Sequence, residues 1–327
     1  MDALSEALKS VHMTGAIFYR AECRRPWGFA VPALETYAPI LAPGTERLVS
    51  YHLVTEGPAL VRFAGAEVSL APGDLLIMPH GNPHLLSNGH PRQIVQAGIS
   101  LDHSLAGQIS MLQIGGEGEM TRLICGYFGC DRRADRLFLG GLPDFIRIPV
   151  RDDPAGAWIE SSIRHLVGLA GADDPGRSIL LSKMAEALFI EALRRYMAGL
   201  PAEQTGWLAA ARDPVVGMAI AAMHADPARR WTLDGLARLA ASSRSVLIDR
   251  FARYLGVAPL AYLATWRMQL ASQRLLTSCE SILQIGLGIG YESEASFIRA
   301  FKREFGQPPA KYRKIMAALA PGPASLS

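Results

Sequence analysis

Apolar residues in the last third of the chain repeat at a nearly constant interval. Leu233, Leu236, Ala237 and Ala240 recur 49 positions later as Ile282, Ile285, Gly286 and Ile289. Leu247, Phe251, Leu255, Gly256 and Pro259 recur 50 positions later as Phe297, Phe301, Phe305, Gly306 and Pro309. Within each copy the apolar residues have helical spacing on both sides of a short turn. The pattern therefore predicts two helix-turn-helix units, at about 233–255 and about 282–305.

Residues that favour helix ends support both copies. Thr232, Ser243 and Ser281 stand where side-chain oxygens cap helix N-termini, and Gly256 follows a helix, where glycine is favoured. A long helix from Leu260 to about Leu276, roughly 25 Å in length, joins the copies. Two recognition helices held about one DNA turn, roughly 34 Å, apart suit two successive major grooves. The repeat thus indicates DNA reading.

Residues from about 14 to 150 consist of short β-rich runs separated by Gly, Pro and Asp. The runs are Leu48–Val54, Leu60–Phe63, Val68–Leu70, Leu75–Met78 and Gln93–Ile99. Many short strands with such turns are typical of a sandwich or a barrel. We therefore expect a β-rich domain at 1–150.

Helical spacing replaces the strand pattern near residue 155. Apolar residues at 158–169 and 179–197 predict two helices that form a packing or dimerisation unit, although ordinary core helices explain each one equally well. Gly199, Pro201 and Gly206 predict a linker over 198–212. The expected domains are thus 1–150, a connector at 151–212, a DNA-binding module at 213–317 and a tail at 318–327.

Charge is distributed unevenly along the 327 residues, a length that suggests two or three domains. Residues 229–314 carry a net charge of +8 and the remainder −5. This asymmetry fits nucleic-acid binding by the last third, although a merely solvated basic surface explains the charge alone. No apolar run approaches the roughly 20 residues of a membrane span, and Met1–Val11 is no signal peptide. We expect a cytoplasmic protein without a membrane partner.

The four cysteines, Cys23, Cys125, Cys130 and Cys279, have no zinc-finger spacing. Cys23 precedes Arg24 and Arg25, and nearby positive charge lowers a thiol pKa and favours the reactive thiolate. Cys23 is therefore a candidate for oxidant sensing.

The motifs of the last third are similar to those of the AraC/XylS family of regulators. They read Leu-x-x-Leu-Ala, Ser-Arg-Ser, Pro-x-x-Tyr-Leu and Trp-Arg-Met, then Gly-Tyr-x-Ser and Phe-x-Arg-Ala-Phe-Lys-Arg-x-Phe-Gly-x-x-Pro, over about 215–315. The resemblance implies binding to double-stranded DNA without enzymatic activity. We also expect RNA polymerase as a partner and, from the pair of helices between 157 and 197, a homodimer.

Carried over to this chain, the family pattern implies DNA contacts on both recognition helices. The implied base contacts are Ser245, Ile248 and Asp249 in the first unit, and Glu294, Ala295 and Arg299 in the second. The further candidates for DNA contact are Ser243, Ser293 and the basic residues Arg244, Arg250 and Lys302, which contact phosphates or are merely solvated. Asp249 departs from the family, where a basic residue is common. An acidic residue there weakens phosphate binding or accepts a hydrogen bond from cytosine N4. In the second helix, the guanidinium group of Arg299 can donate two hydrogen bonds to guanine O6 and N7.

Gly73, Pro79, Gly81, His84 and Asn88 have a spacing that resembles the second cupin motif. The resemblance implies an α+β protein: an N-terminal cupin-like β-barrel, a helical connector and a C-terminal all-α module with two helix-turn-helix units. The barrel would sense a small-molecule or oxidant effector, with Trp27, Phe29, His52 and His84 as its lining.

A metal site is an alternative use of the same barrel. No cofactor is required, but Cys23, His52 and His84 are candidate ligands for Zn²⁺ or another divalent metal. A His-x-His motif is missing ahead of the second cupin motif. This disfavours the alternative function, a cupin-type metalloenzyme fused to a DNA-binding domain. A constitutive DNA-binding protein whose barrel only dimerises stays open.

Overall fold

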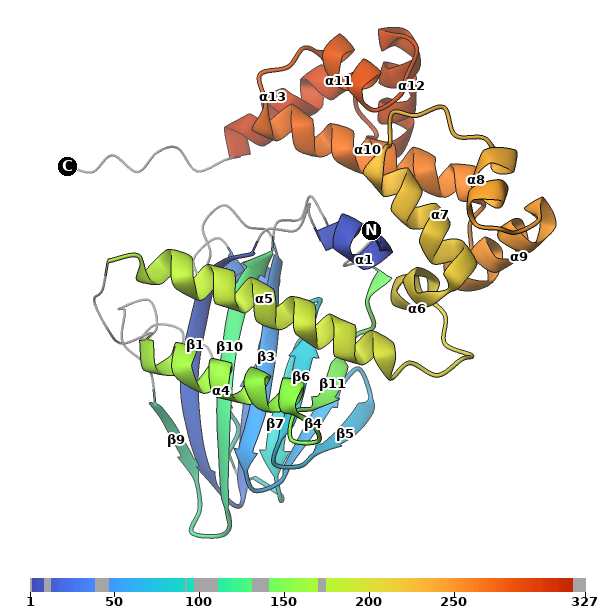
Figure 1. Ribbon diagram of the computed structural model, residues 1–327. Coiled ribbons are helices and arrows are strands. Elements are labelled where there is room, and N and C mark those ends of the chain that lie inside the picture. The colour runs from blue at the N-terminus through green and yellow to red at the C-terminus, as the bar shows by residue number, and fades with distance from the viewer. Residues whose placement is uncertain are drawn as a thin grey trace. The chain divides into compact units, whose positions relative to one another are not determined.

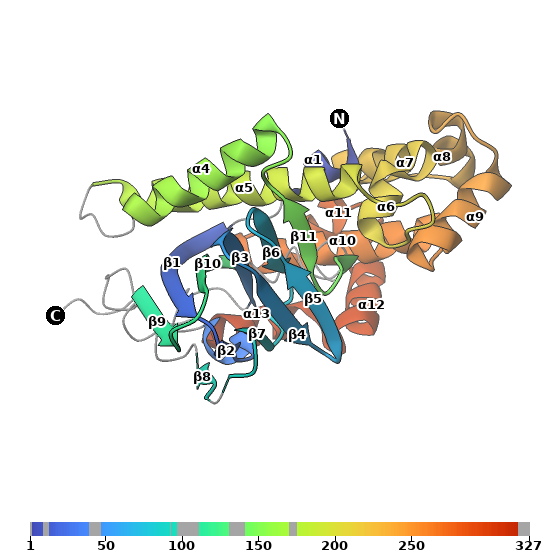
Figure 2. The ribbon, with the colours of Figure 1, turned by 90° about the horizontal axis from the view of Figure 1, so that it is seen from below.

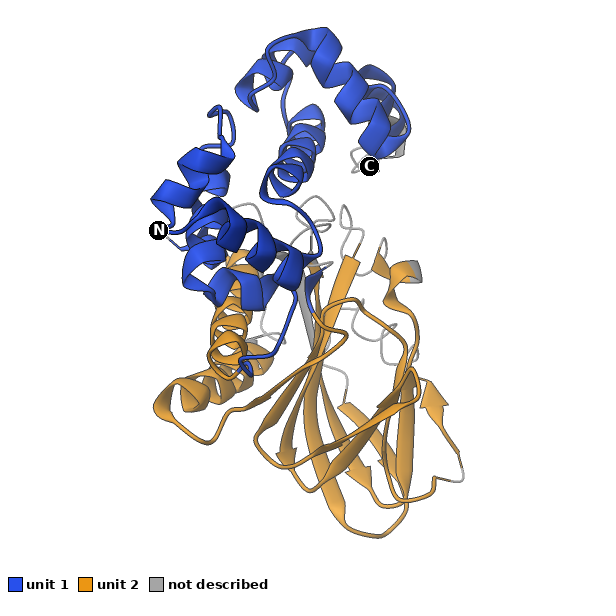
Figure 3. Cartoon of the chain, turned by 90° about the vertical axis from the view of Figure 1, so that its right-hand side faces the viewer, with its two compact units in different colours: residues 1–11, 132–142, 200–327 blue, residues 12–131, 143–199 orange. Residues whose placement is uncertain are grey.

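The computed structural model describes residues 2–8, 13–38, 47–91, 93–96, 111–130, 141–169 and 175–319. It divides into two compact units (Figure 3). The sheet unit comprises 12–131 and 143–199, and the helical unit comprises 1–11, 132–142 and 200–327. These boundaries differ from the expected ones, because segments 1–11 and 132–142 belong to the helical unit and the expected connector is shared between the units. Residues 320–327 of the expected tail lie outside the described residues.

Two sheets form the sheet unit (Figures 1 and 2). The six-stranded sheet has the order β11-β6-β3-β10-β1-β9, with β1 Met13–Arg24, β3 Arg47–Glu56, β6 Asp74–Met78, β9 Met111–Gly115, β10 Met120–Cys130 and β11 Ile146–Pro149. The five-stranded sheet has the order β5-β4-β7-β2-β8, with β2 Trp27–Val31, β4 Ala59–Phe63, β5 Ala66–Leu70, β7 His84–Asn88 and β8 Val95–Gln96. A short 3-10 helix, η1 Leu34–Thr36, follows β2.

The expected α+β fold is confirmed, with a sheet-rich N-terminal unit and a helical unit, but the two sheets are not closed into the expected barrel and form a sandwich. Within the described ranges no strand of one sheet is hydrogen-bonded to a strand of the other, so the sheets meet through side chains only. Four of the predicted runs are confirmed as β3, β4, β5 and β6. The described part of the fifth, Gln93–Ile99, contains the short β8.

Two helices cover the outer face of the six-stranded sheet (Figures 1 and 2). They are α4 Pro154–Leu169 and α5 Arg177–Ala198. Ile163 and Leu166 of α4 and Phe189 of α5 are buried, and the Phe189 ring lies 5.4 Å from that of Phe128 on β10. These helices therefore serve as core helices of the sheet unit.

The helical unit holds the repeat predicted from the sequence. Its helices are α1 Ala3–Leu8, α6 Trp207–Arg212, α7 Pro214–Ala225, α8 Leu233–Leu239, α9 Arg244–Leu255, α10 Pro259–Thr277, α11 Ile282–Gly288, α12 Glu294–Phe305 and α13 Pro309–Leu319. Helix α6 occupies residues 207–212 of the linker expected over 198–212, whereas residues 199–206 form no helix or strand. It forms because the buried Trp207 anchors it, donating from Nε1 to the Tyr262 hydroxyl at 2.8 Å.

Helix α1 joins this unit from the far end of the chain by packing against α6 and α7. Among the described helices, none has both the length and the apolar composition needed to cross a membrane.

Candidate nucleic-acid interface and sensor core

The first helix-turn-helix unit consists of α8 and α9 with the turn Ala241–Ser243. Thr232 caps α8 by accepting from Gly235 N, and Ser243 caps α9 by accepting from Val246 N at 3.3 Å. Leu247 and Phe251 bury the inner face of α9, and Gly256 ends it in the left-handed conformation at φ +69°. The predicted caps and helix end are thus confirmed, whereas Leu255, the next residue of the apolar stripe, is only half-buried.

The second unit, α11 and α12, repeats this design with a tighter crossing. Gly286 is buried on α11, and a Cβ added there would lie 3.1 Å from three atoms of the Phe297 side chain. Ser293 caps α12 by accepting from Ser296 N at 3.3 Å. Phe297 and Phe301 are fully buried and contact each other with ring centroids 5.7 Å apart.

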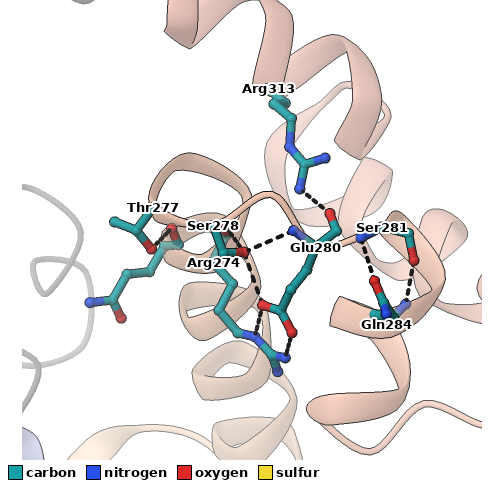
Figure 4. Close-up of polar contacts among 8 residues, drawn as sticks. Arg274, Thr277, Ser278, Glu280, Ser281, Gln284 and Arg313 are labelled. Atoms are coloured by element: carbon teal, nitrogen blue, oxygen red, sulfur yellow. Dashed lines mark hydrogen bonds and ion pairs between the residues drawn. The ribbon is translucent and has the colours of Figure 1, made fainter.

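A polar cluster fixes the loop that leads from α10 into α11 (Figure 4). Ser281 and Gln284 form a capping box, in which Ser281 N donates to Gln284 Oε1 at 2.9 Å and Gln284 N donates to Ser281 Oγ at 3.2 Å. Arg274 Nε donates to Glu280 Oε2 at 2.9 Å, and Arg313 of α13 donates to the carbonyl oxygens of Leu275 and Glu280. The loop therefore holds α10, α11 and α13 in one arrangement.

The residues predicted to contact DNA lie at the start or on the exposed side of the two recognition helices. Exposed positions are Ser243, Arg244, Ser245, Ile248 and Asp249 of the first unit, and Ser293, Glu294, Ala295, Arg299 and Lys302 of the second. The hydroxyls of Ser243 and Ser293 serve as helix caps. These base and phosphate contacts stay predictions.

Two arginines of α9 are held by acids that sequence reasoning did not assign to them. Arg244 forms an ion pair with Asp234 of α8. The half-buried Arg250 donates from Nη1 to Oδ2 of Asp213 at 2.7 Å, and Asp213 also caps α7 through Val215 N and Val216 N. Capping explains the position of Asp213, but its ion pair with residue 250 depends on tertiary packing.

In the sheet unit, the four predicted effector residues form one continuous row inside the sandwich. The Trp27 and Phe29 rings stack at 5.9 Å, and the Phe29 ring lies 6.4 Å from that of His52. His52 of β3 and His84 of β7 approach through their Nε2 atoms at 2.8 Å. All four side chains are buried. The structure thus brings together residues that are widely separated in sequence.

The hydrogen bonds of the two histidines fix where their protons lie. His84 Nδ1 lies 2.8 Å from the carbonyl oxygen of Asn82, which only accepts, so this nitrogen carries the proton. Burial lowers the pKa of His84 to about 4 and that of His52 well below its usual value, so both rings are neutral near pH 7. His84 Nε2 therefore carries no proton and accepts a hydrogen bond from His52 Nε2. Since the proton of the neutral His52 ring is on Nε2, its Nδ1 is an acceptor. This atom is buried and has no hydrogen-bond partner.

Cys23 lies in the same interior but does not join the histidines. Burial raises the pKa of its thiol to about 12, which is opposite to the direction expected from Arg24 and Arg25. The expected thiolate activation is therefore wrong, because both arginine side chains are exposed while the thiol is buried. Within the described residues, no three His, Cys, Asp or Glu side chains lie close enough to hold a metal ion.

Sequence reasoning missed the polar residues beside His52. Strand register places Cys125 of β10 opposite His52, and Tyr19 of β1 opposite Cys125. The Tyr19 and Tyr127 hydroxyls lie 3.4 Å apart. Alternation along β1 and β10 is the only signal that would have placed these side chains inside.

Comparison with known proteins assigns both halves of the chain. Residues 2–198 match the Cupin family and residues 236–315 match the helix-turn-helix domain family. The chain is 31% identical to an AraC-like transcription regulator of Streptomyces lividans over 82% of this chain and 87% of that protein.

Two further relatives are similar over most of the chain. The HTH-type transcriptional regulator AlkR of Acinetobacter baylyi is 28% identical over 96% of this chain and 99% of its own length. The RCS-specific HTH-type transcriptional activator RclR of Escherichia coli is 28% identical over 85% of this chain and 88% of its own. The chain therefore belongs to the AraC family of DNA-binding transcription regulators and carries a cupin domain at its N-terminal end.

Proposed function

We propose that the protein is an effector-responsive regulator whose sheet unit binds a small organic molecule and thereby changes DNA binding or polymerase recruitment. The bare, buried Nδ1 of His52 is the observation that carries this proposal. Leaving a buried acceptor without a partner costs about 1–3 kcal/mol. A bound molecule that donates an O–H or N–H to this nitrogen would recover that free energy.

A cavity beside His84 gives such a molecule a place to enter. It is an open groove with a volume of about 710 Å³, and His84, not His52, is among its lining residues. Val31, Pro32 and Phe63 supply apolar surface, and His84 connects the cavity to the buried pair. The Arg62–Glu67 ion pair lies at the same cavity. The site suits a neutral molecule with an apolar body and one donor group.

Phenol and toluene form a matched pair of probes for this site, because they differ in the O–H donor. In the full-length protein with ¹⁵N-labelled histidine, we expect phenol to shift the His52 Nδ1 resonance and toluene to leave it unchanged. The variant His52→Phe should abolish the phenol effect. Equal responses to the two probes, or no response to either, would contradict the proposal.

Zn²⁺ fits this interior only in part. His52 and His84 supply two imidazole nitrogens, whereas a zinc site in a protein needs three or four ligands. The described residues add no third one. Metal analysis of the purified protein showing one tightly bound ion per chain would favour a metal sensor over an organic effector.

The effector must act by differential binding, because a ligand shifts an equilibrium only as far as its affinities for two states differ. We include a homodimer in the proposal because Trp158 of α4 and Ile179 and Leu180 of α5 expose apolar surface.

Footprinting on DNA upstream of the protein's own gene tests whether an effector changes DNA binding. Protection of two adjacent grooves that changes when the effector is added would support the proposal. A footprint that is the same with and without every effector would favour a constitutive DNA-binding protein.

A further inference from the structure

The two recognition helices are aligned copies, which allows a comparison position by position. Residues 244–255 of α9 correspond to residues 294–305 of α12 with a constant offset of 50. Leu247 and Phe251, like Phe297 and Phe301, form the buried stripe. At about 100° per residue, the sixth position lies directly opposite that stripe. Asp249 and Arg299 occupy this position, and both are exposed.

The central position of the reading surface thus carries opposite charges in the two units. The charge at the first position of each helix is reversed as well, with Arg244 in α9 and Glu294 in α12. The opposite charges do not neutralise each other, because in the described part of the chain neither Asp249 nor Arg299 forms an ion pair. Both side chains are available to a ligand.

Neighbouring residues give the first recognition helix an acidic centre. Arg244 pairs with Asp234 of α8 on the exposed surface, and Arg250 pairs with the buried Asp213, so two of the positive charges on α9 have an acidic partner in the same chain. The second unit has Leu283 where the first has Asp234. Arg299, Lys302 and Arg303 of α12 are exposed without an ion pair among the described residues. On α9 only Arg253, near the end of the helix, is exposed without an ion pair among the described residues. The second helix therefore presents the larger unpaired basic surface.

Asp249 and Arg299 recognise different base edges in the major groove. A carboxylate only accepts hydrogen bonds, so Asp249 requires a base that donates, and cytosine N4 is the donor that Asp reads. A guanidinium group only donates hydrogen bonds, so Arg299 requires a base with acceptors. Guanine presents two acceptors, O6 and N7, which can accept two hydrogen bonds from the guanidinium group. The two units therefore cannot share one preferred base at equivalent positions.

We infer that the operator consists of two unlike elements, with a cytosine read by Asp249 and a guanine read by Arg299. The inference rests on sequence-specific DNA binding by the helix-turn-helix units. The two bases lie about one helical turn, roughly 10 base pairs, apart. If the copies enter successive grooves in the same orientation, both bases lie on one strand. The reversed charges thereby give the binding site a direction.

Selection of duplexes from a random pool by the full-length protein, followed by sequencing, tests this inference. We expect a C and a G about one turn apart. Asp249→Arg should convert the first base to G, and Asp249→Asn should convert it to A, because Asn reads adenine N6 and N7. In both variants the G read by Arg299 serves as the internal control and should not change.

The reciprocal variant tests the second helix. Arg299→Ala should reduce discrimination at the G by about 5- to 150-fold and leave the C preference intact. Equal loss on selected and random DNA would instead make Arg299 a phosphate contact.

One outcome overturns the inference and keeps DNA binding. If both Asp249 variants bind all duplexes more tightly and the preferred bases stay the same, Asp249 only repels phosphates. If the unmodified protein selects no sequence at all, sequence-specific binding itself fails. Because all the substituted side chains are exposed, circular dichroism of each variant should match the parent protein.

Discussion

His52 and His84 lie in different sheets of the sandwich, and their Nε2 atoms approach to 2.8 Å. This bond joins β3 to β7 across an interior that is otherwise mostly apolar. Because both rings are neutral, one Nε2 donates and the other accepts, so each residue satisfies the Nε2 atom of the other.

We expect the two histidines to be energetically coupled. His84→Leu leaves the His52 N–H buried without an acceptor and should lower the free energy of unfolding by about 1–3 kcal/mol. Removing both partners with His52→Leu and His84→Leu together should cost clearly less than the sum of the single changes. Urea unfolding of the four proteins measures this, and strictly additive costs would contradict the coupling.

The turn of the first helix-turn-helix unit contains a strained residue. Ala241 has φ +47°, in the left-handed region, whereas the corresponding residue of the second unit is Gly290 at φ +90°. A residue with a Cβ pays about 1–2 kcal/mol in this region. We expect Ala241→Gly to stabilise the helical unit by about 1 kcal/mol in thermal or urea unfolding.

Gly290→Ala provides the opposite control for that change. Its Cβ would lie 2.6 Å from the carbonyl oxygen of Ala228, so this variant should be clearly destabilised. A destabilising effect of both substitutions would show that the strain at Ala241 is not relieved by glycine.

The N-terminal helix should contribute to the stability of the helical unit. Ala3, Leu4, Ala7 and Leu8 of α1 are buried, and the helix packs on α6 and α7. Leu4→Ala should lower the unfolding free energy of this unit by about 2–5 kcal/mol. The exposed Ser5→Ala is the matched control and should change it by less than about 1 kcal/mol. Equal stability of the two variants would mean that α1 does not support the unit.

Local patterns were sufficient to predict the repeat, because its caps and apolar stripes are properties of short segments. Thr232, Ser243 and Ser281 are caps in the structure, and Gly256 ends α9 as expected. The family assignment follows from the same segments.

Contacts between distant segments could not be predicted in this way. The Arg250–Asp213 pair joins two helices, and its partners are 37 residues apart. The unexpected α6 owes its position to Trp207 binding Tyr262, a residue of α10. The pKa of Cys23 was predicted in the wrong direction, because neighbours in sequence do not reveal which side of a strand is buried. The separation of the sheets likewise depends on side-chain packing over the whole sandwich.

Acid should destabilise the helical unit through His224. This side chain is buried, its ring stacks on Trp266 with centroids 3.7 Å apart, and its Nε2 lies 2.9 Å from the Tyr262 hydroxyl. Burial lowers its pKa from 6.5 to about 3. Between these two values the unfolded chain binds a proton that the folded chain does not. The stabilising contribution is therefore complete above about pH 6.5 and is lost as the pH falls toward 3.

Urea unfolding at pH 7 and pH 5 measures this contribution, which should amount to about 2 kcal/mol over that interval. The buried His52 and His84 of the sheet unit shift stability in the same direction. The comparison must therefore be made with His224→Gln, which cannot titrate but retains hydrogen-bonding groups for Tyr262. This variant should lose about 2 kcal/mol less than the parent protein between pH 7 and pH 5. Parallel pH profiles for the two proteins would show that His224 accepts a proton as readily in the folded as in the unfolded chain.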